Sequence, residues 1–290
     1  MTATLPSYRS HGARPSDPSK LVGLLDAALH PMIGAKLGAG ALPSESNILG
    51  PWGIRFNQLN TESCSAHAGS AALSIALSFA GCALPFVPSP HVLYSASGRI
   101  EMPRGPLLDN GRQLADVVTA MHTFGVAPTG DMPDGPTDIT PINVCQDVTP
   151  DEIALARQHL LSYGNHLIDP AGAGCEDQVI ATLTSQHPAP VYLGANVGDA
   201  FQALEAGDVA EPDTSHGPTD GGHALCIVGH RTRADGSREY LVLNSWGDDW
   251  CEGGLCWASA AWLRACWELR PFTAASPTLL QRIAASLGLP

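Results

Sequence analysis

The chain has 290 residues, of which 44% are hydrophobic and 15% are charged. This composition is typical of a packed globular protein, either one large domain or two lobes around a cleft, and it excludes disorder over the whole chain. Lys and Arg total 15 against 28 Asp and Glu, which gives a net charge of −13. Such a surface repels phosphate backbones, so we expect no nucleic-acid partner.

The N-terminal region shows no export signal. The first twenty residues lack the continuous apolar core of a secretory signal. The apolar stretch 21–41 contains Asp26, His30 and Lys36, whose burial in lipid is unfavourable, so we expect no membrane span. Three locations stay open: the cytoplasm, export by a non-standard route, and association with a particle.

The cysteines indicate a reduced protein. Eight cysteines in a long chain without a signal favour mostly free thiols over a disulfide framework. The spacing of Cys251, Cys256 and Cys266 matches no common zinc pattern. We therefore expect neither a metal nor a cofactor. We also expect Cys82 and Cys226 to be buried packing thiols.

Both ends of the chain are expected to lie outside the main globular body. Residues 1–19 are rich in Pro, Ser and Arg and predict a flexible arm. The apolar positions of 21–30 repeat at helical spacing and predict a short amphipathic helix, either inhibitory or docking a protein partner. We therefore treat 1–41 as an N-terminal arm, which is a pro-segment or a docking element. A similar small helix is expected at 277–287, within a C-terminal tail of residues 273–290.

The body of the chain predicts helices first and strands afterwards. Helix signals run from the N-cap Ser63 to Gly81, from Asn110 to Gly125, after the cap Thr149, and over 177–185. Strand signals follow at 190–196, 223–231 and 238–244, the last two joined by a turn at Asp235-Gly236. This order predicts an α+β protein with a mainly helical lobe, a mainly β lobe and a cleft between them.

Three separated segments carry the chemistry. They are Gln58-Leu-Asn-Thr-Glu-Ser-Cys64-Ser-Ala-His, Gly221-Gly-His223-Ala-Leu, and Leu243-Asn244-Ser-Trp246-Gly. Together they resemble papain-like cysteine peptidases, and the motif sequences are closer to those of bacterial members. The resemblance covers about 42–272, the expected catalytic domain. It implies the two-lobed papain-like fold, with an antiparallel, barrel-like β lobe, and it suggests a bacterial or phage source.

Four residues are expected to be catalytic. Cys64 opens a helix, where the macrodipole and the unpaired backbone N–H groups favour a thiolate nucleophile. His223 can take the thiol proton and later give it to the leaving amine. Asn244 can orient the imidazole without adding charge. Gln58 and the Cys64 backbone N–H would stabilise the oxyanion.

Further residues are expected to contact the substrate. Gly111, with Asn110 before it, resembles the stretch of the family that pairs with the substrate backbone; a plain turn explains the pattern equally well. Gly222 precedes the base, and Trp246 would cover the contact between His223 and Asn244. The other two expected contacts flank the nucleophile and depart from the family pattern: Glu62, Ser65.

These departures affect the predicted function. Glu62 would place a carboxylate beside the substrate, favouring a basic side chain, or partly obstruct the groove. Ser65 would loosen it. We expect a cysteine-type endopeptidase that hydrolyses peptide or isopeptide bonds through a Cys64 thioester. Two alternatives stay open: an acyl transferase or transamidase on the same triad, and an idle papain-fold adaptor in a larger assembly or virion.

Overall fold

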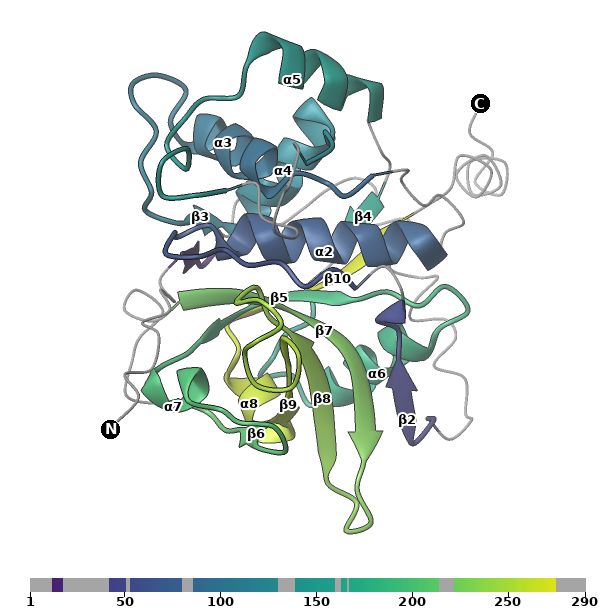
Figure 1. The fold of residues 1–290 in the computed structure, drawn as a ribbon. Coiled ribbons are helices and arrows are strands. Elements are labelled where there is room, and N and C mark those ends of the chain that lie inside the picture. The colour runs from purple at the N-terminus through teal and green to yellow at the C-terminus, as the bar shows by residue number, and fades with distance from the viewer. Residues whose placement is uncertain are drawn as a thin grey trace, which may run out of the picture.

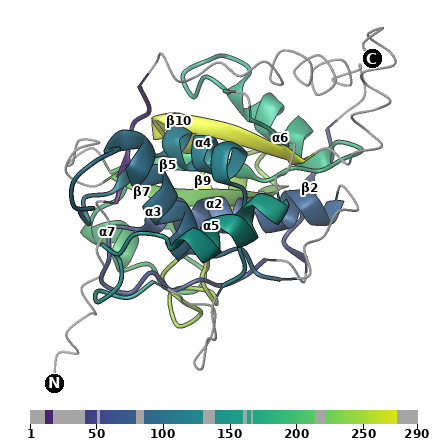
Figure 2. The ribbon, with the colours of Figure 1, turned by 90° about the horizontal axis from the view of Figure 1, so that it is seen from above.

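The computed structural model describes residues 12–17, 42–50, 53–79, 86–129, 139–159, 163–165, 167–213 and 222–274. Helices α3, α4 and α5 form one layer, a sheet forms the other, and α2 lies between them (Figure 1). Seen from above, α3, α4 and α5 gather over α2 (Figure 2). The central helix is α2 Cys64–Phe79, and the layer above it holds α3 Pro90–Glu101, α4 Leu114–Phe124 and α5 Pro150–Ala156, the last followed by the short η3 Arg157–His159.

The large sheet runs in the order β4-β10-β5-β7-β8-β9-β6, with β2 also paired to β7. Its pairings are antiparallel except that of β6 with β9. Its strands are β2 Glu45–Asn47, β4 Tyr163–Asn165, β5 Val191–Asn196, β6 Val209–Ala210, β7 Gly222–Thr232, β8 Arg238–Leu243, β9 Leu255–Ser259 and β10 Glu268–Ala274. Helices α6 Cys175–Thr184, α7 Asp199–Gln202 and α8 Ala260–Ala265 flank it. The α+β, papain-like arrangement expected from the sequence is confirmed.

Small side chains bring α2 close to its neighbours. The helix is rich in Ala, Ser and Gly, and all its residues from Cys64 to Leu77 are buried. A Cβ at Gly69 would lie 3.0 Å from Val117 and 3.1 Å from Met121, both on α4. A helix that is buried on all sides needs such residues to pack at short range. α2 can therefore contact α4 and the sheet at once, and its first residue is fixed from both sides.

Many of the helices and strands of this fold were predicted from the sequence. The first two predicted helices match α2 and α4, and the capping box that Thr149 forms with Glu152 opens α5. The fourth begins at Cys175, two residues before the expected start. The strands match β5, β7 and β8, and Gly236 turns the β7–β8 hairpin with a φ of 84°.

Several elements were not predicted. Helix α3 begins at Pro90 behind the N-cap Ser89, whose side chain accepts from the Val92 N–H; this signal was present in the sequence. Strands β9 and β10 were missed because charged and aromatic residues interrupt their apolar pattern. The helices expected at 21–30 and 277–287 and the cysteine Cys82 lie outside the described residues.

The arm prediction was wrong for residues 12–17. Instead of extending freely, Ala13–Arg14 form β1, which pairs in parallel with β3 Arg112–Gln113. A polar, Pro-containing segment gives no local strand signal, because its partner lies about a hundred residues away. We call residues 12–17 the strap.

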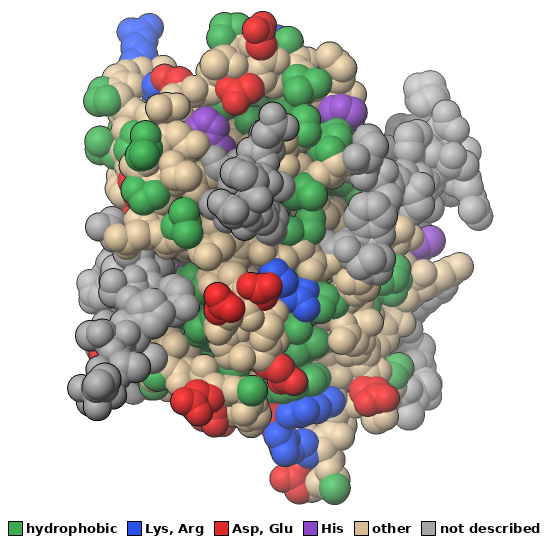
Figure 3. All heavy atoms as spheres, in the orientation of Figure 1, with side chains coloured by type: hydrophobic (Ala, Val, Ile, Leu, Met, Phe, Trp, Pro, Cys, Tyr) green, Lys and Arg blue, Asp and Glu red, His purple; other side chains and the backbone are tan. Residues whose placement is uncertain are grey.

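Charged side chains gather on the β lobe. Red and blue side chains collect over the β7–β8 hairpin (Figure 3), where Glu239 pairs with Arg231 and Arg233. Among the described residues, no helix is long and apolar enough to cross a bilayer. The described part of the chain also holds no cluster of His, Cys, Asp or Glu arranged for a metal ion.

Candidate active site

Cys64 lies at the N-terminus of α2 and is fully buried. Its thiol is hydrogen bonded by backbone groups of Ala224, Ser65 and Gly12, which favour the thiolate. Burial outweighs them and, with a smaller contribution from the charge of Glu62, raises the pKa of Cys64 to about 12. In this form of the protein the thiol is neutral at physiological pH.

His223 is the second residue of β7 and is also fully buried. Its Nε2 lies 2.8 Å from Oδ1 of Asn244, and the backbone N–H of Ser245 donates to the same oxygen at 2.7 Å. Because an amide oxygen only accepts, Nε2 carries the proton, and Nδ1 is the basic nitrogen of the neutral ring. The next residue, Ala224, contacts the Cys64 thiol, so base and nucleophile belong to one site.

Aromatic rings cover this pair. Trp246 stacks on His223 with ring centroids 4.8 Å apart and planes 26° apart. Phe201 meets the edge of Trp246 at 5.8 Å and stacks on Trp250 at 5.4 Å. A bond between imidazole and amide is stronger where water is excluded, so these rings strengthen the orientation of His223 by Asn244. The sequence predicted this place for Trp246.

Gln58 is tied to the segment that carries Asn244. Its Oε1 accepts from the hydroxyl of Ser245 at 2.7 Å, and its Nε2 donates to the carbonyl of Thr61 at 2.8 Å. Its backbone N–H donates to the Ser245 carbonyl. The two lobes are thus joined at this point, and the amide of Gln58 is held just before the helix that carries Cys64.

The predicted substrate contacts divide into two groups. Gly111 has a φ of 75°, and a Cβ there would lie 2.4 Å from the carbonyl oxygen of Gly12. Asn110 accepts from Arg112, and Glu62 donates its backbone N–H to Asp109. The carbonyl oxygen of Glu62 also lies against Gly12, so Glu62 and Gly111 both border the strap.

Gly222 and Ser65 are different. Gly222 begins β7 opposite Asn196 and is buried. Ser65 is fully buried, and its carbonyl accepts from the hydroxyl of Tyr192 at 2.9 Å. The backbone of Ser65 is thus bonded to the sheet beneath, and the loosening of the groove expected from Ser65 stays a prediction.

The strap fills the space that the sequence assigned to a substrate. The backbone N–H of Arg112 donates to the Gly12 carbonyl at 2.8 Å. Arg14 pairs with Glu101 and donates to the Gly111 carbonyl at 3.1 Å. Ser16 donates to Glu268 through both its backbone N–H and its hydroxyl. Segments of both lobes hold the strap across Cys64.

Two carboxylates that hold the strap, Glu101 and Glu268, were not predicted as site residues. Glu101 ends α3, which was not predicted. Glu268 lies in β10 beside Arg270, and both are almost completely buried. A buried carboxylate is rare unless paired, and neither the strap nor Arg270 could be assigned as its partner from spacing alone.

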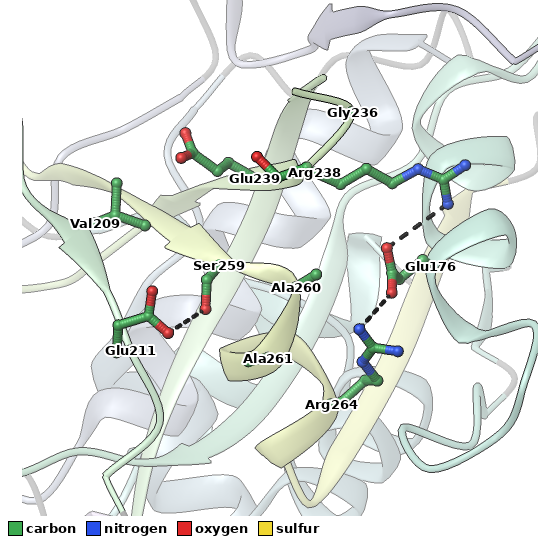
Figure 4. A pocket seen from close by; sticks show the side chains of 11 residues that line it. Glu176, Val209, Glu211, Gly236, Arg238, Glu239, Ser259, Ala260, Ala261 and Arg264 are labelled. Atoms are coloured by element: carbon green, nitrogen blue, oxygen red, sulfur yellow. Dashed lines mark hydrogen bonds and ion pairs between the residues drawn. The ribbon is translucent and has the colours of Figure 1, made fainter. Parts of the chain in front are cut away.

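A separate hollow of about 770 Å³ lies on the β lobe (Figure 4). Glu176 pairs there with Arg264 at 3.0 Å and with Arg238 at 3.7 Å, and Ser259 donates to Glu211. The charges of both arginines are thus balanced within the chain. None of the predicted site residues lines this hollow.

Known proteins share the fold and part of the sequence. Residues 158–266 match the model of the papain family cysteine proteases. Over this segment, about a third of its length, the chain is similar to the papain family. The matched segment includes His223 and Asn244, while Gln58 and Cys64 precede it.

Individual proteins show the same similarity. Vignain of Phaseolus vulgaris is 38% identical over 82 residues, which are 28% of this chain and 21% of that protein. A cathepsin B-like protein, CP3, of Giardia intestinalis is 45% identical over 65 residues, 22% and 21% of the two chains. The matches therefore span about a fifth of each relative. Xylellain, a cysteine protease from Xylella fastidiosa, superposes with a TM-score of 0.69 at 19% identity, covering 94% of this chain and 100% of its own.

Proposed function

We propose that the chain is a cysteine peptidase that hydrolyses peptide or isopeptide bonds through a thioester on Cys64. The observation that carries the proposal is the fixed triad geometry. Cys64 begins α2, the next residue after His223 contacts its thiol, and Asn244 accepts from Nε2 of the imidazole. Two N–H donors, one from the His223 imidazole and one from the Ser245 backbone, bind the same oxygen of Asn244. An imidazole held in one orientation by an amide supports a catalytic role for His223.

The reaction follows from these atoms. Nδ1 of His223 takes the thiol proton, and the Cys64 sulfur attacks the substrate carbonyl. The backbone N–H of Cys64 and the amide of Gln58 stabilise the oxyanion. The imidazolium then protonates the amine, which leaves as the thioester forms. Water, deprotonated by His223, hydrolyses the thioester and releases the acid.

The strap must leave before a substrate can bind. Gly12 contacts the thiol, and the raised pKa of Cys64 keeps it protonated. We therefore propose that the N-terminal arm is inhibitory, rather than only a docking element for a partner. This assigns the described form of the chain to a latent state.

Labelling with an epoxide or vinyl-sulfone thiol probe, followed by digestion of a peptide library, tests the proposal. Strap-displaced protein should be labelled at Cys64 and should cleave peptides, and Cys64→Ala should lose both properties. Cys145→Ala is the matched control, because Cys145 is an exposed thiol away from the triad. Cleavage that survives in Cys64→Ala would refute the proposal. Ligated products in place of acids would point to acyl transfer instead.

A further inference from the structure

The end of α3 presents a carboxylate to the groove. Glu101 is the last residue of the helix, and its side chain is 12% exposed. The backbone N–H of Gln113 donates to its Oε1 at 3.1 Å, which fixes the carboxylate independently of the strap. Its other oxygen, Oε2, receives the guanidinium of Arg14. A preformed acceptor thus faces the position that a bound chain occupies.

The strap binds this groove in the manner of an added strand. Ala13–Arg14 pair with Arg112–Gln113, so main-chain bonds hold the segment along β3. In strand addition, backbone pairing provides affinity while the sites for side chains provide specificity. With Gly12 at the Cys64 thiol, Arg14 lies two residues further along the strap, and its guanidinium reaches both Glu101 and the Gly111 carbonyl.

Other arginines of this region are engaged elsewhere. Arg99, on the same helix as Glu101, donates to Asp147. Arg112 lies over the ring of Tyr94 and donates to the carbonyls of Leu108 and Gly111. When Arg14 departs, neither of them is in place to neutralise Glu101. A partly buried carboxylate that has lost its cation favours a new one, because burial weakens its solvation.

We propose that Glu101 is a specificity-determining residue that binds an arginine or lysine side chain of the substrate, and that Arg14 is a built-in competitor for this position. The inference rests on the proposed peptidase function and names the class of peptide it accepts. The strap thereby carries the same recognition element as the substrate, at the place where a cleavable chain would carry it.

The test measures kcat/KM for paired fluorogenic peptides that differ only by Arg or Ala within a few residues of the scissile bond. Arg14→Ala should prefer the Arg peptide. Adding Glu101→Gln to Arg14→Ala should lower this preference about tenfold, with little change on the Ala peptide, since Gln still accepts from Gln113. Both proteins lack Arg14, so a difference in strap release does not enter the comparison. Asp151→Asn in the same background, an exposed carboxylate on α5, should leave the preference unchanged.

Charge reversal supplies a second measurement. Glu101→Lys in the Arg14→Ala background should prefer a Glu peptide over the Arg peptide, a gain that a misfolded protein does not show. Cleavage with no preference for Arg, or a preference that Glu101→Gln leaves intact, would overturn this inference and leave the peptidase standing. Absence of any Cys64-dependent cleavage in all these variants would overturn the peptidase function, and the inference with it.

Discussion

The carbonyl oxygen of Glu62 occupies the space that a side chain on Gly12 would need. A Cβ at Gly12 would lie 2.1 Å from that oxygen, far inside van der Waals contact. Glu62 precedes the nucleophile by two residues, so the absence of a side chain at position 12 permits the backbone of the strap to reach Cys64. This close approach is the structural basis of the proposed latent form.

Replacement of Gly12 should therefore expose the nucleophile. Gly12→Val cannot fit against the backbone of Glu62 without moving the strap. We expect Cys64 to react with iodoacetamide at least tenfold faster at pH 7.5. Mass spectrometry of the labelled peptides measures the rate, with the exposed Cys145 as an internal standard. Equal labelling of Cys64 in wild type and Gly12→Val would contradict the occlusion.

The pH dependence of this labelling should move as well. Burial holds the pKa of Cys64 at about 12 in the strapped form. Since the thiolate is the reactive species, the wild-type rate at Cys64 should still be rising above pH 10. Displacement of the strap admits water and removes the main cause of the shift, so the midpoint in Gly12→Val should fall by several pH units. A profile with the same midpoint in both proteins would show that the strap does not control the acidity of the thiol.

Gln58→Ala tests the oxyanion role. Loss of one such donor lowers kcat by about 10²–10³-fold, and we expect this in the strap-displaced background, with labelling of Cys64 largely retained. Ser245→Ala is the companion variant, because Ser245 donates to Oε1 of Gln58 and acts only through its position. A smaller loss is expected there. If Gln58→Ala kept full kcat, the oxyanion would need a different donor.

His67 should make the fold sensitive to acid. It lies one turn beyond Cys64, is fully buried against Phe56, and has a pKa lowered by burial to about 4. In the unfolded chain the pKa is near 6.5. Between these values the unfolded state binds a proton that the folded state refuses, so the free energy of unfolding falls as the pH drops from 6.5 to 4. The full loss is about 3 kcal/mol.

Urea denaturation at pH 7.5 and pH 4.5 measures this loss. His67→Phe should remove most of it, leaving the smaller contributions of His122 and His230, whose pKa values burial also lowers. His187→Gln, at an exposed position, should keep the wild-type dependence. A His67→Phe protein that weakens with acid as much as the wild type would disprove the assignment.

Sequence reasoning could place the elements that carry the candidate triad because their signals are local. Helix α2 begins at Cys64, β7 begins one residue before His223, and Asn244 follows the next strand, so short-range signals suffice once the order is known. The wall of the groove depends on distant pairings. The contacts of Arg14 with Glu101 and of Ser16 with Glu268 join residues 87 and 252 positions apart, and no periodicity marks them. The hydrogen bond from Tyr192 to the Ser65 carbonyl likewise joins distant residues and was not predicted.

The strap and Cys64 belong to one covalent chain, so the blocking segment is present at a high effective concentration that dilution cannot change. Latency should therefore be the same in a crowded compartment and in a dilute extract. A soluble peptide must outcompete a tethered one, which makes proteolytic nicking or a partner that captures the arm a more efficient trigger than the accumulation of substrate.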